Sequence, residues 1–278
     1  MNFKLYREYG ALNSKPVFDA IESGIKKLGW RVCDSNEDIP VIWSVLWSGR
    51  MRNNQLIHTQ ALQKNKPVLI IEVGNLKRNQ TWRLSLNHIN NLGFFANKEN
   101  LDISIPKKLG VSLCDLQKNR SDKIMIATQH KQSLQWQGQK SMEDWIEDKI
   151  KILRSYTDRS IVIRPHPRSP LARNISGAEI NQPKKLADSY DDFDIDYNFH
   201  CVINFNSGPA VQAAIQGVPI ICDRSSLAYP VSDQIENIEN ITLPDREQWF
   251  LELCHTEWHI DEIAQGLPLI RLQEKFDL

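Results

Sequence analysis

Short runs of apolar residues alternate along the chain with segments in which apolar residues recur every three or four positions. Runs of this kind predict strands that are buried within a sheet. They cover residues 3–6, 30–33, 41–47, 67–71, 123–127, 160–163, 201–203 and 219–222. The segments between them predict helices, most clearly at 15–28 and at 142–156, where Ser141 is the expected N-cap. Strands that alternate with helices predict an α/β fold with parallel sheets.

Residues 107–122 interrupt this alternation, because they are polar and charged and have no regular apolar period. We therefore expect an N-terminal domain over residues 1–120 and a second domain over residues 121–257. The last segment, residues 258–278, is expected to cross back to the first domain. Residues 75–100 also lack a clear period and predict a long loop, which in a compact domain is more often functional than idle.

The composition is that of a soluble globular protein. The 278 residues are enough for two domains with their own cores, and no apolar run is long enough to span a bilayer. No signal-peptide pattern opens the chain. The five cysteines are odd in number and scattered, which predicts reduced thiols in the cytoplasm and not a disulfide framework or a metal site.

The net charge is zero, but it is unevenly placed. Residues 1–120 contain 18 Lys and Arg against 10 Asp and Glu, a net charge of +8, whereas residues 121–278 contain 16 against 24, a net charge of −8. A basic half suggests contact with a polyanion such as DNA, although ordinary solvated charges give the same count. The candidate DNA-binding residues are Arg50, Arg52, Lys64, Lys66, Lys77, Arg78 and Arg83.

Residues 201–226 predict a strand, a tight turn, a short helix and a second strand. Ser207 is the expected N-cap, Pro209 fits the first helical turn, and Gly217 is the expected left-handed residue that ends the helix. In such a βαβ unit the N-terminus of the helix lies at the C-terminal edge of a parallel sheet, where it can bind a phosphate. Asn206, Ser207 and Gly208 are therefore candidate phosphate contacts, and a purely structural corner is the alternative.

Residues 164–168 read Arg-Pro-His-Pro-Arg and follow a predicted strand. The two prolines are expected to keep the segment extended, so that Arg164, His166 and Arg168 share one face. Two guanidinium groups and an imidazolium suit a diphosphate, because the arginines bind its oxygens and the histidine can stabilise or protonate a departing phosphate. A proline-rich surface loop is the alternative.

Polar residues also follow two other predicted strands. Gln129 and His130 follow the first strand of the second domain and are candidates to contact a phosphate or a sugar, with a structural loop as the alternative. Glu72 ends an apolar strand and is the candidate general base for an alcohol nucleophile, with a salt bridge to Arg78 or Arg83 as the alternative. The other candidate bases are Asp34, Glu37 and Asp38.

No Asp-x-Asp pair follows a predicted strand. The pair Asp194-Ile195-Asp196 follows an acidic loop and is expected to be solvated surface. We therefore expect neither a metal site nor a resident cofactor.

Taken together, these motifs resemble GT-B glycosyltransferases. The resemblance rests on two α/β halves, on the pair His166-Pro167 after a strand of the second half, and on Ser207 in a strand-to-helix turn. In capsule-polysaccharide transferases and several sialyltransferase families of this type, the corresponding residues bind the donor's phosphate and the base lies in the N-terminal domain. The resemblance implies two Rossmann-like domains with parallel sheets facing a central cleft. This chain is shorter than the larger GT-B enzymes, and it has one serine where some families have Ser-Ser or Ser-Thr.

Four stretches resemble more narrowly the bacteriophage enzymes that add glucose or arabinose to hydroxymethylated pyrimidines of DNA. They are residues 70–74, 81–87, 129–136 and 164–168. This resemblance implies transfer from a UDP-linked sugar to double-stranded DNA in the cytoplasm of a host cell, with no membrane partner. Two alternatives stay open, which are a capsule- or lipopolysaccharide-type transferase with a saccharide acceptor and a non-catalytic nucleic-acid-binding module.

Overall fold

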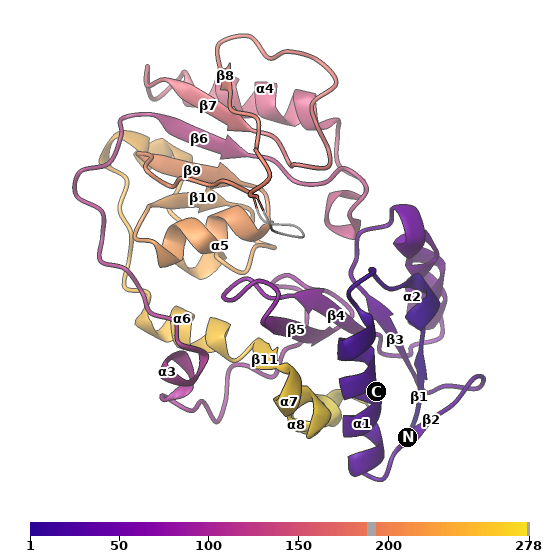
Figure 1. Ribbon diagram of the computed structural model, residues 1–278. Helices are drawn as coiled ribbons and strands as arrows, with labels where there is room; N and C mark the ends of the chain where they lie inside the picture. The colour runs from indigo at the N-terminus through magenta and orange to yellow at the C-terminus, as the bar shows by residue number, and fades with distance from the viewer. Residues whose placement is uncertain (188–192, 277–278) are drawn as a thin grey trace. The chain divides into compact units, whose positions relative to one another are not determined.

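Two β-sheets organise the protein, each at the centre of its own unit (Figure 1). The computed structural model describes residues 1–187 and 193–276. Unit 1 comprises Met1–Val111, Gln132–Leu134 and Leu251–Leu278, and unit 2 comprises Ser112–Lys131 and Gln135–Phe250. The sequence predicted boundaries after residues 120 and 257, which lie several residues beyond the divisions after Val111 and Phe250.

The sheet of unit 1 has the strand order β11-β5-β4-β3-β1-β2. Strands β1 to β4 are parallel to one another, whereas β5 is antiparallel to β4 and β11 is antiparallel to β5. The strands are β1 (Asn2–Leu5), β2 (Arg31–Val32), β3 (Ile39–Trp43), β4 (Leu69–Val73), β5 (Thr81–Leu86) and β11 (Glu257–His259). This sheet is therefore mixed, whereas the sequence predicted a parallel sheet.

Strand β5 lies within residues 75–100, which the sequence predicted to be a loop, so that prediction is wrong. The strand alternates two sets of side chains: Thr81, Arg83 and Ser85 share one face of the sheet, and Trp82, Leu84 and Leu86 share the other. All of them except Trp82 are buried. The sequence of this strand alternates polar and apolar residues without exception, which is the signal of a strand that the prediction missed.

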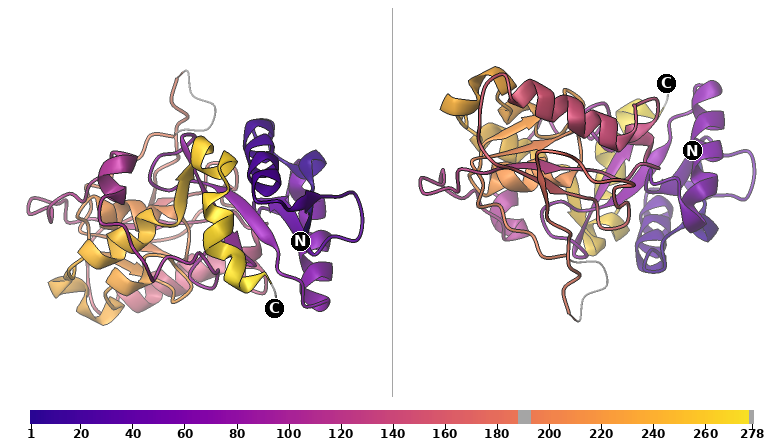
Figure 2. Two further views of the ribbon diagram at one scale, coloured as in Figure 1. Left: turned by 90° about the horizontal axis from the view of Figure 1, so that it is seen from below. Right: turned by 90° about the horizontal axis from the view of Figure 1, so that it is seen from above.

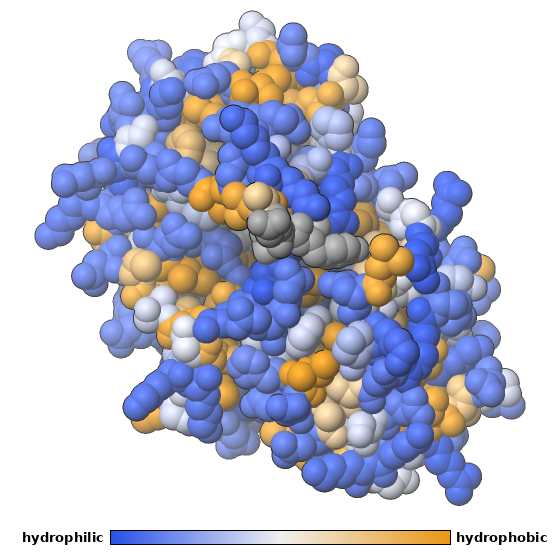
Figure 3. All heavy atoms as spheres, in the orientation of Figure 1, coloured by the Kyte–Doolittle hydropathy of each residue, from blue (hydrophilic) through white to orange (hydrophobic). Residues whose placement is uncertain are grey.

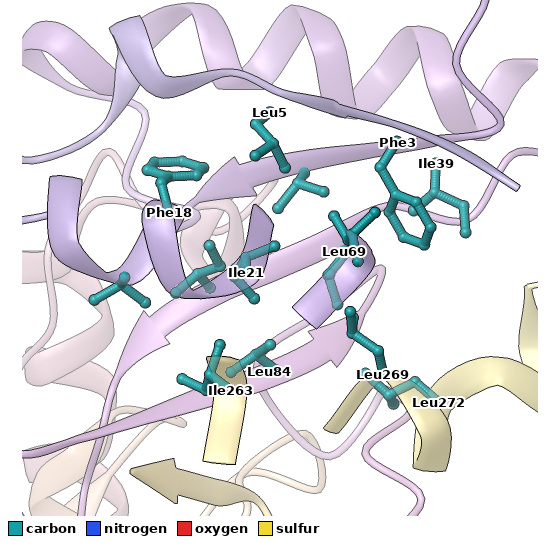
Figure 4. Packing of buried hydrophobic residues seen from close by; sticks show 14 of the residues in the cluster. Phe3, Leu5, Phe18, Ile21, Ile39, Leu69, Leu84, Ile263, Leu269 and Leu272 are labelled. Carbon is teal, nitrogen blue, oxygen red and sulfur yellow. The ribbon is translucent and has the colours of Figure 1, made fainter. Parts of the chain in front are cut away.

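The main core of unit 1 lies between one face of its sheet and helices from both ends of the chain. Phe18 and Ile21 of α1 (Lys15–Lys27) meet Ile263 of α7 (Ile260–Ala264) over the strands (Figure 4). Leu269 of α8 (Leu267–Leu272) belongs to the same cluster. The C-terminal helices, yellow in Figures 1 and 2, therefore pack with the N-terminal helix of the chain, drawn in indigo.

Helix α2 (Asn54–Gln63) covers the opposite face of the unit 1 sheet, where Ala61 packs with Ile42 and Ile70. A further short helix, α3 (Ile105–Leu109), overlaps the start of residues 107–122, which the sequence predicted to be an unpatterned boundary. Helix α6 (Glu247–Cys254) contains the second boundary between the units.

The sheet of unit 2 is entirely parallel, as predicted, with the order β10-β9-β6-β7-β8. Its strands are β6 (Ile124–Ala127), β7 (Ile161–Arg164), β8 (Glu179–Ile180), β9 (Cys201–Asn204) and β10 (Ile220–Cys222). From β6 the chain adds β7 and β8 on one side and then β9 and β10 on the other. The strand order therefore reverses between β6 and β9, and ligands of doubly wound sheets bind at such a point.

Helix α4 (Met142–Leu153) lies along the unit 2 sheet (Figure 2). Its Trp145 and Ile146 belong to one buried cluster with Ile126 and Ile163. The Ser141 hydroxyl accepts a hydrogen bond from the Asp144 N–H at 3.1 Å, which confirms the predicted N-cap. The face drawn in Figure 3 is mostly hydrophilic, with apolar side chains in small separate groups. Within residues 1–187 and 193–276, no helix is long and apolar enough to cross a membrane.

Helix α5 (Gly208–Ile215) is followed by Gly217 in the predicted left-handed conformation, at φ +79°. A Cβ atom there would lie 2.0 Å from the carbonyl oxygen of Asp115. We expect Gly217→Ala to lower the free energy of unfolding by roughly 2–5 kcal/mol, through backbone strain and displacement of that backbone. Urea unfolding measures the change. Gly177→Ala is the control, because Gly177 has the same φ and open space around it; equal losses for the two variants would contradict the close approach.

Candidate functional site

Candidate residues of unit 2 gather at the C-terminal ends of three adjacent strands. Gln129 and His130 follow β6, His166 follows β7, and Ser207 follows β9 just before α5. Strands β9, β6 and β7 are neighbours and parallel, so these segments emerge at one edge of the sheet. This edge includes the point where the strand order reverses, so the topology alone favours it as a ligand site.

Asn204, the last residue of β9, fixes the position of Ser207. Its Oδ1 accepts a hydrogen bond from the Ser207 N–H at 2.8 Å, and its Nδ2 donates to Ser207 Oγ at 2.9 Å and to the Ala127 carbonyl at 2.8 Å. Ser207 occupies the N-cap position, but its hydroxyl does not cap α5 as the sequence predicted. Because its oxygen accepts from Asn204, its hydrogen can be donated to a ligand at the positive end of the helix.

His166 stands at the first position of a tight turn. Its N–H donates to Thr128 Oγ1 at 2.8 Å, and its carbonyl accepts from the Ser169 N–H at 2.9 Å. The predicted extended conformation of 164–168 is therefore wrong. The physical reason is Pro167, whose fixed φ suits the second position of a β-turn as well as it suits an extended chain.

The turn also fixes which nitrogen of His166 carries the proton. The Arg168 N–H donates to His166 Nδ1 at 3.1 Å, so Nδ1 is an acceptor and the proton of the neutral ring lies on Nε2. The His130 ring packs edge-to-face on this imidazole, with centroids 5.2 Å apart. Burial, with the positive charges of Arg168 and Lys131, lowers the pKa of His130. The ring of His166 is thus oriented by its Nδ1 contact, which leaves Nε2–H as its donor.

Arg164 does not join this group. Its guanidinium donates to Asn181 Oδ1 at 3.0 Å and to Asp194 Oδ1 at 2.9 Å, and the three residues line a separate cavity of about 510 Å³. The expectation that Arg164, His166 and Arg168 share a face is therefore wrong, because the turn ends the strand register. In the described part of the chain, no group of three His, Cys, Asp or Glu is placed to hold a metal ion.

Gln129 and Asn206 are buried polar residues of the edge, with 3% and 7% of their surface exposed. Gln129 Oε1 accepts a hydrogen bond from the Asn206 N–H at 3.3 Å, and Asn206 Nδ2 donates to Ser225 Oγ at 2.8 Å. Gln129 Nε2 and Asn206 Oδ1 have no partner among the residues that the structure describes. An unpaired buried polar atom costs about 1–3 kcal/mol, so a ligand that pairs with these atoms would recover that free energy.

In unit 1, Glu72 belongs to a row of polar residues across four strands. Glu72 is paired in register with Arg83, and Arg83 with Glu257; Ser44 follows β3 at the next position of the β3–β4 register. The Ser44 hydroxyl donates to Glu72 Oε2 at 2.7 Å. Ser44 has φ +62°, which is strained for a serine, and such residues are enriched at functional sites. Glu72 is half-buried, so one carboxylate of the row is accessible.

Arg83 is not a surface residue. It is 8% exposed and donates to the carbonyls of Val73 at 3.3 Å and Ile89 at 3.0 Å. Burial lowers the pKa of Arg83 despite the carboxylates of Glu72 and Glu257 beside it. Burial likewise raises the pKa of Glu257, which accepts hydrogen bonds from the Thr81 hydroxyl and from the loop after β4. The prediction that Arg83 belongs to a DNA-binding surface is therefore wrong.

The remaining basic candidates are divided between two edges of the unit 1 sheet. Arg50 and Arg52 follow β3, and Lys77 and Arg78 connect β4 to β5, so these four follow the C-terminal ends of parallel strands. Lys64 and Lys66 precede β4 at the other edge, where the Lys66 ammonium donates to the Glu37 carbonyl. The predicted set therefore does not form a single surface.

The other candidate bases also lie away from Glu72. Asp38 Oδ2 accepts a hydrogen bond from the N–H of Asn2, the first residue of β1. Glu37 and Asp34 belong to the same short loop between β2 and β3. These three carboxylates therefore lie near the N-terminal edge of the sheet, whereas Glu72 lies near the C-terminal end of its strand.

Sequence comparison alone gives no relatives: no protein-family model and no curated protein matches the chain. Solved structures do resemble it. The β-Kdo 2,4 transferase of KpsC from Thermosulfurimonas dismutans has a TM-score of 0.51 and 11% identity, over 96% of this chain and 98% of that chain. The KpsC β-Kdo 2,7 transferase of the same organism has a TM-score of 0.49 and 11% identity, over 98% and 99%. The UDP-GlcNAc 2-epimerase of Methanocaldococcus jannaschii has a TM-score of 0.32 and 12% identity, over 97% and 99%.

The chain has a GT-B-like fold. This conclusion rests on the two α/β units and on the similarity to the 2,4 transferase. At 11% identity the similarity concerns the fold and not the reaction. The GT-B-like fold agrees with the fold class predicted from the sequence.

The sequence did not predict several residues that shape this edge of the unit 2 sheet. Thr128 and Asn204 each end a buried apolar run, and they hold His166 and Ser207 in place. Asp223 and Ser225 follow β10 and orient Asn206. The sequence signal that could have found them is a polar residue at the last position of an apolar strand. Ser44 had no such signal, because its backbone strain is visible only in three dimensions.

Proposed function

We propose that the protein is a glycosyltransferase and that unit 2 binds its nucleotide-sugar donor. The observation that carries the proposal is that one edge of the unit 2 sheet holds His166 after β7 and, after β9, the Ser207 hydroxyl and the N-terminus of α5. All three favour negative charge, and none of them is a fixed ionic charge. Arg168 and Lys131 add exposed positive charge to the same edge.

These groups suit a phosphate that leaves. When the bond between the anomeric carbon and the phosphate oxygen breaks, its electron pair stays on the phosphate, and donors that are already oriented stabilise the new charge. The acceptor oxygen forms the new bond to the anomeric carbon and must lose its proton. Glu72 in unit 1 is our candidate to take that proton, because Ser44 orients its carboxylate.

For the substrates, we propose a UDP-linked glucose or arabinose as donor and a hydroxymethylated pyrimidine of double-stranded DNA as acceptor. The acceptor proposal is supported by the net charge of +8 over residues 1–120 and by the stretches that resemble phage enzymes. The DNA-contacting residues in this proposal are Arg50, Arg52, Lys77 and Arg78, which follow neighbouring strands at one edge of the sheet.

The test is incubation of the full chain with a panel of sugar nucleotides and three acceptors: hydroxymethylated DNA, unmodified DNA and capsule-type oligosaccharides. Mass spectrometry of nucleosides and oligosaccharides then reports transfer. We expect sugar to appear on hydroxymethylated DNA only, and we expect a His166→Ala preparation to show much less product.

The outcomes separate the parts of the proposal. Transfer to an oligosaccharide would keep the glycosyltransferase and overturn the DNA acceptor. Duplex binding without transfer from any donor would favour the non-catalytic nucleic-acid-binding module. If the chain shows no sugar transfer and binds no nucleotide, the proposed function as a whole is overturned.

A further inference from the structure

The two unpaired atoms at the edge of the unit 2 sheet have opposite hydrogen-bonding character. Gln129 Oε1 faces the Asn206 N–H, which can only donate, so this end of the amide must be the oxygen. The unpaired end of Gln129 is therefore the NH₂ group, a donor. The orientation follows from the hydrogen-bond partners and not from the shape of the side chain.

The orientation of Asn206 follows from a chain of hydrogen bonds. The Ser225 hydroxyl donates to Asp223 Oδ1 at 2.6 Å, so its oxygen must accept from Asn206, at 2.8 Å. The end of Asn206 that meets Ser225 is therefore the NH₂ group. Its unpaired end is the carbonyl oxygen Oδ1, an acceptor.

The two residues lie opposite each other. Ala127 of β6 is paired with Asn204 of β9, and Gln129 and Asn206 each follow two positions later, on either side of the point where the strand order reverses. An uncharged donor and an uncharged acceptor are thus buried together beside Ser207. A phosphate oxygen could pair with Gln129 Nε2 but would be repelled by Asn206 Oδ1, because both are acceptors.

A hydroxyl group satisfies both atoms, since it accepts from one and donates to the other. We infer that Gln129 and Asn206 recognise a hydroxyl group of the nucleotide-sugar donor, close to its phosphate. Asn206 directly precedes Ser207, so the recognised hydroxyl lies within a few atoms of the phosphate. It belongs either to the ribose or to the transferred sugar. This inference rests on the proposed function, because it specifies how the proposed donor is selected.

The experiment measures binding to the full chain by calorimetry. UDP, CMP, ADP and GDP are compared first, and the one that binds most tightly is the probe, together with its glucose conjugate. Forms that lack the ribose 2′- or 3′-hydroxyl, or the glucose 2- or 3-hydroxyl, are then compared with the parent compounds. We expect one of these deletions to weaken binding to the wild-type protein about 10- to 100-fold, because it leaves buried groups unpaired. The ribose and glucose deletions distinguish the two sources of the hydroxyl.

The Gln129→Met variant shows whether Gln129 is the group that reads the hydroxyl. If it is, deleting the hydroxyl and replacing Gln129 remove the same contact. The deletion should then weaken binding several-fold less in the variant than in the wild type. Gln137→Met, at an exposed position of unit 2, is the control and should keep the full effect of the deletion. Gln129→Glu keeps the acceptor for the Asn206 N–H, and it replaces Gln129→Met if that variant does not fold.

Three results would overturn the inference. Equal losses in wild type and variant would mean that Gln129 does not read the hydroxyl. No loss for any deletion would mean that the two atoms hold only a structural water or meet the nucleobase. Both results leave nucleotide binding, and with it the proposed function, intact. If the wild-type chain binds no nucleotide and transfers no sugar, the proposed function fails and the inference fails with it.

Discussion

We expect His166→Ala to lower the rate of sugar transfer by about 10²- to 10³-fold, the usual effect of removing one oriented donor to a developing charge. Thr128 and the turn at Ser169 hold the backbone of His166, and the Arg168 N–H holds its ring with Nε2–H as the donor. Because the loss arises mainly as the phosphate departs, kcat should fall much more than nucleotide affinity. Steady-state kinetics with calorimetric nucleotide binding would measure both.

The matched control is His88→Ala, because His88 is a partly buried histidine of unit 1 that lies outside the candidate groups. It should keep near-normal transfer when compared at equal folded fraction. Affinity for duplex DNA should be nearly unchanged in both variants. Normal turnover in His166→Ala would remove His166 from the reaction.

We expect Glu72→Gln to slow transfer by about 10²- to 10⁴-fold, the usual contribution of a general base. The amide keeps an oxygen that can accept from Ser44, so the local structure should persist while the basicity is lost. Binding of donor and of DNA should therefore stay close to wild type. Single-turnover rates with calorimetric binding separate these effects.

Glu37→Gln is the control for the base, because Glu37 lies in the loop before β3 on the same sheet. It should transfer sugar normally. If Glu72→Gln retains near-wild-type transfer while a substitution of Asp34, Glu37 or Asp38 abolishes it, the base lies in that loop and our assignment fails.

Strands β6, β7, β9 and β10 of unit 2 could be predicted because each is a continuous apolar run, whereas the short, exposed β8 is not such a run and was not predicted. Strand β6 and strand β9 begin and end within a residue of the predicted runs, and Gly217 ends α5 as expected. Such strands are buried on both faces, so hydrophobicity alone identifies them. Candidate residues that directly follow them, such as Gln129 and Asn206, were placed correctly at one edge for the same reason.

The rest depended on contacts between residues that are distant in sequence. The burial of Arg83 and Thr81 could not be predicted, because Glu257, which accepts a hydrogen bond from Thr81 and lies opposite Arg83, is far along the chain. The sequence predicted Arg164 to bind a phosphate, but Arg164 forms an ion pair with Asp194, which lies far along the chain. Pro167 fits a turn and an extended chain equally well, and Thr128 is part of what holds the turn in place.

We propose above all that a nucleotide sugar binds at the edge of the unit 2 sheet formed by β6, β7 and β9. Hydrogen exchange of the full chain, with and without a saturating nucleotide sugar, tests it most directly, because bound ligand slows the opening of the backbone that holds it. We predict slower exchange in residues 128–131, 166–169 and 206–211, and a smaller effect in Asn206→Ala. Protection confined to other segments, or none while the ligand is bound, would contradict the claim.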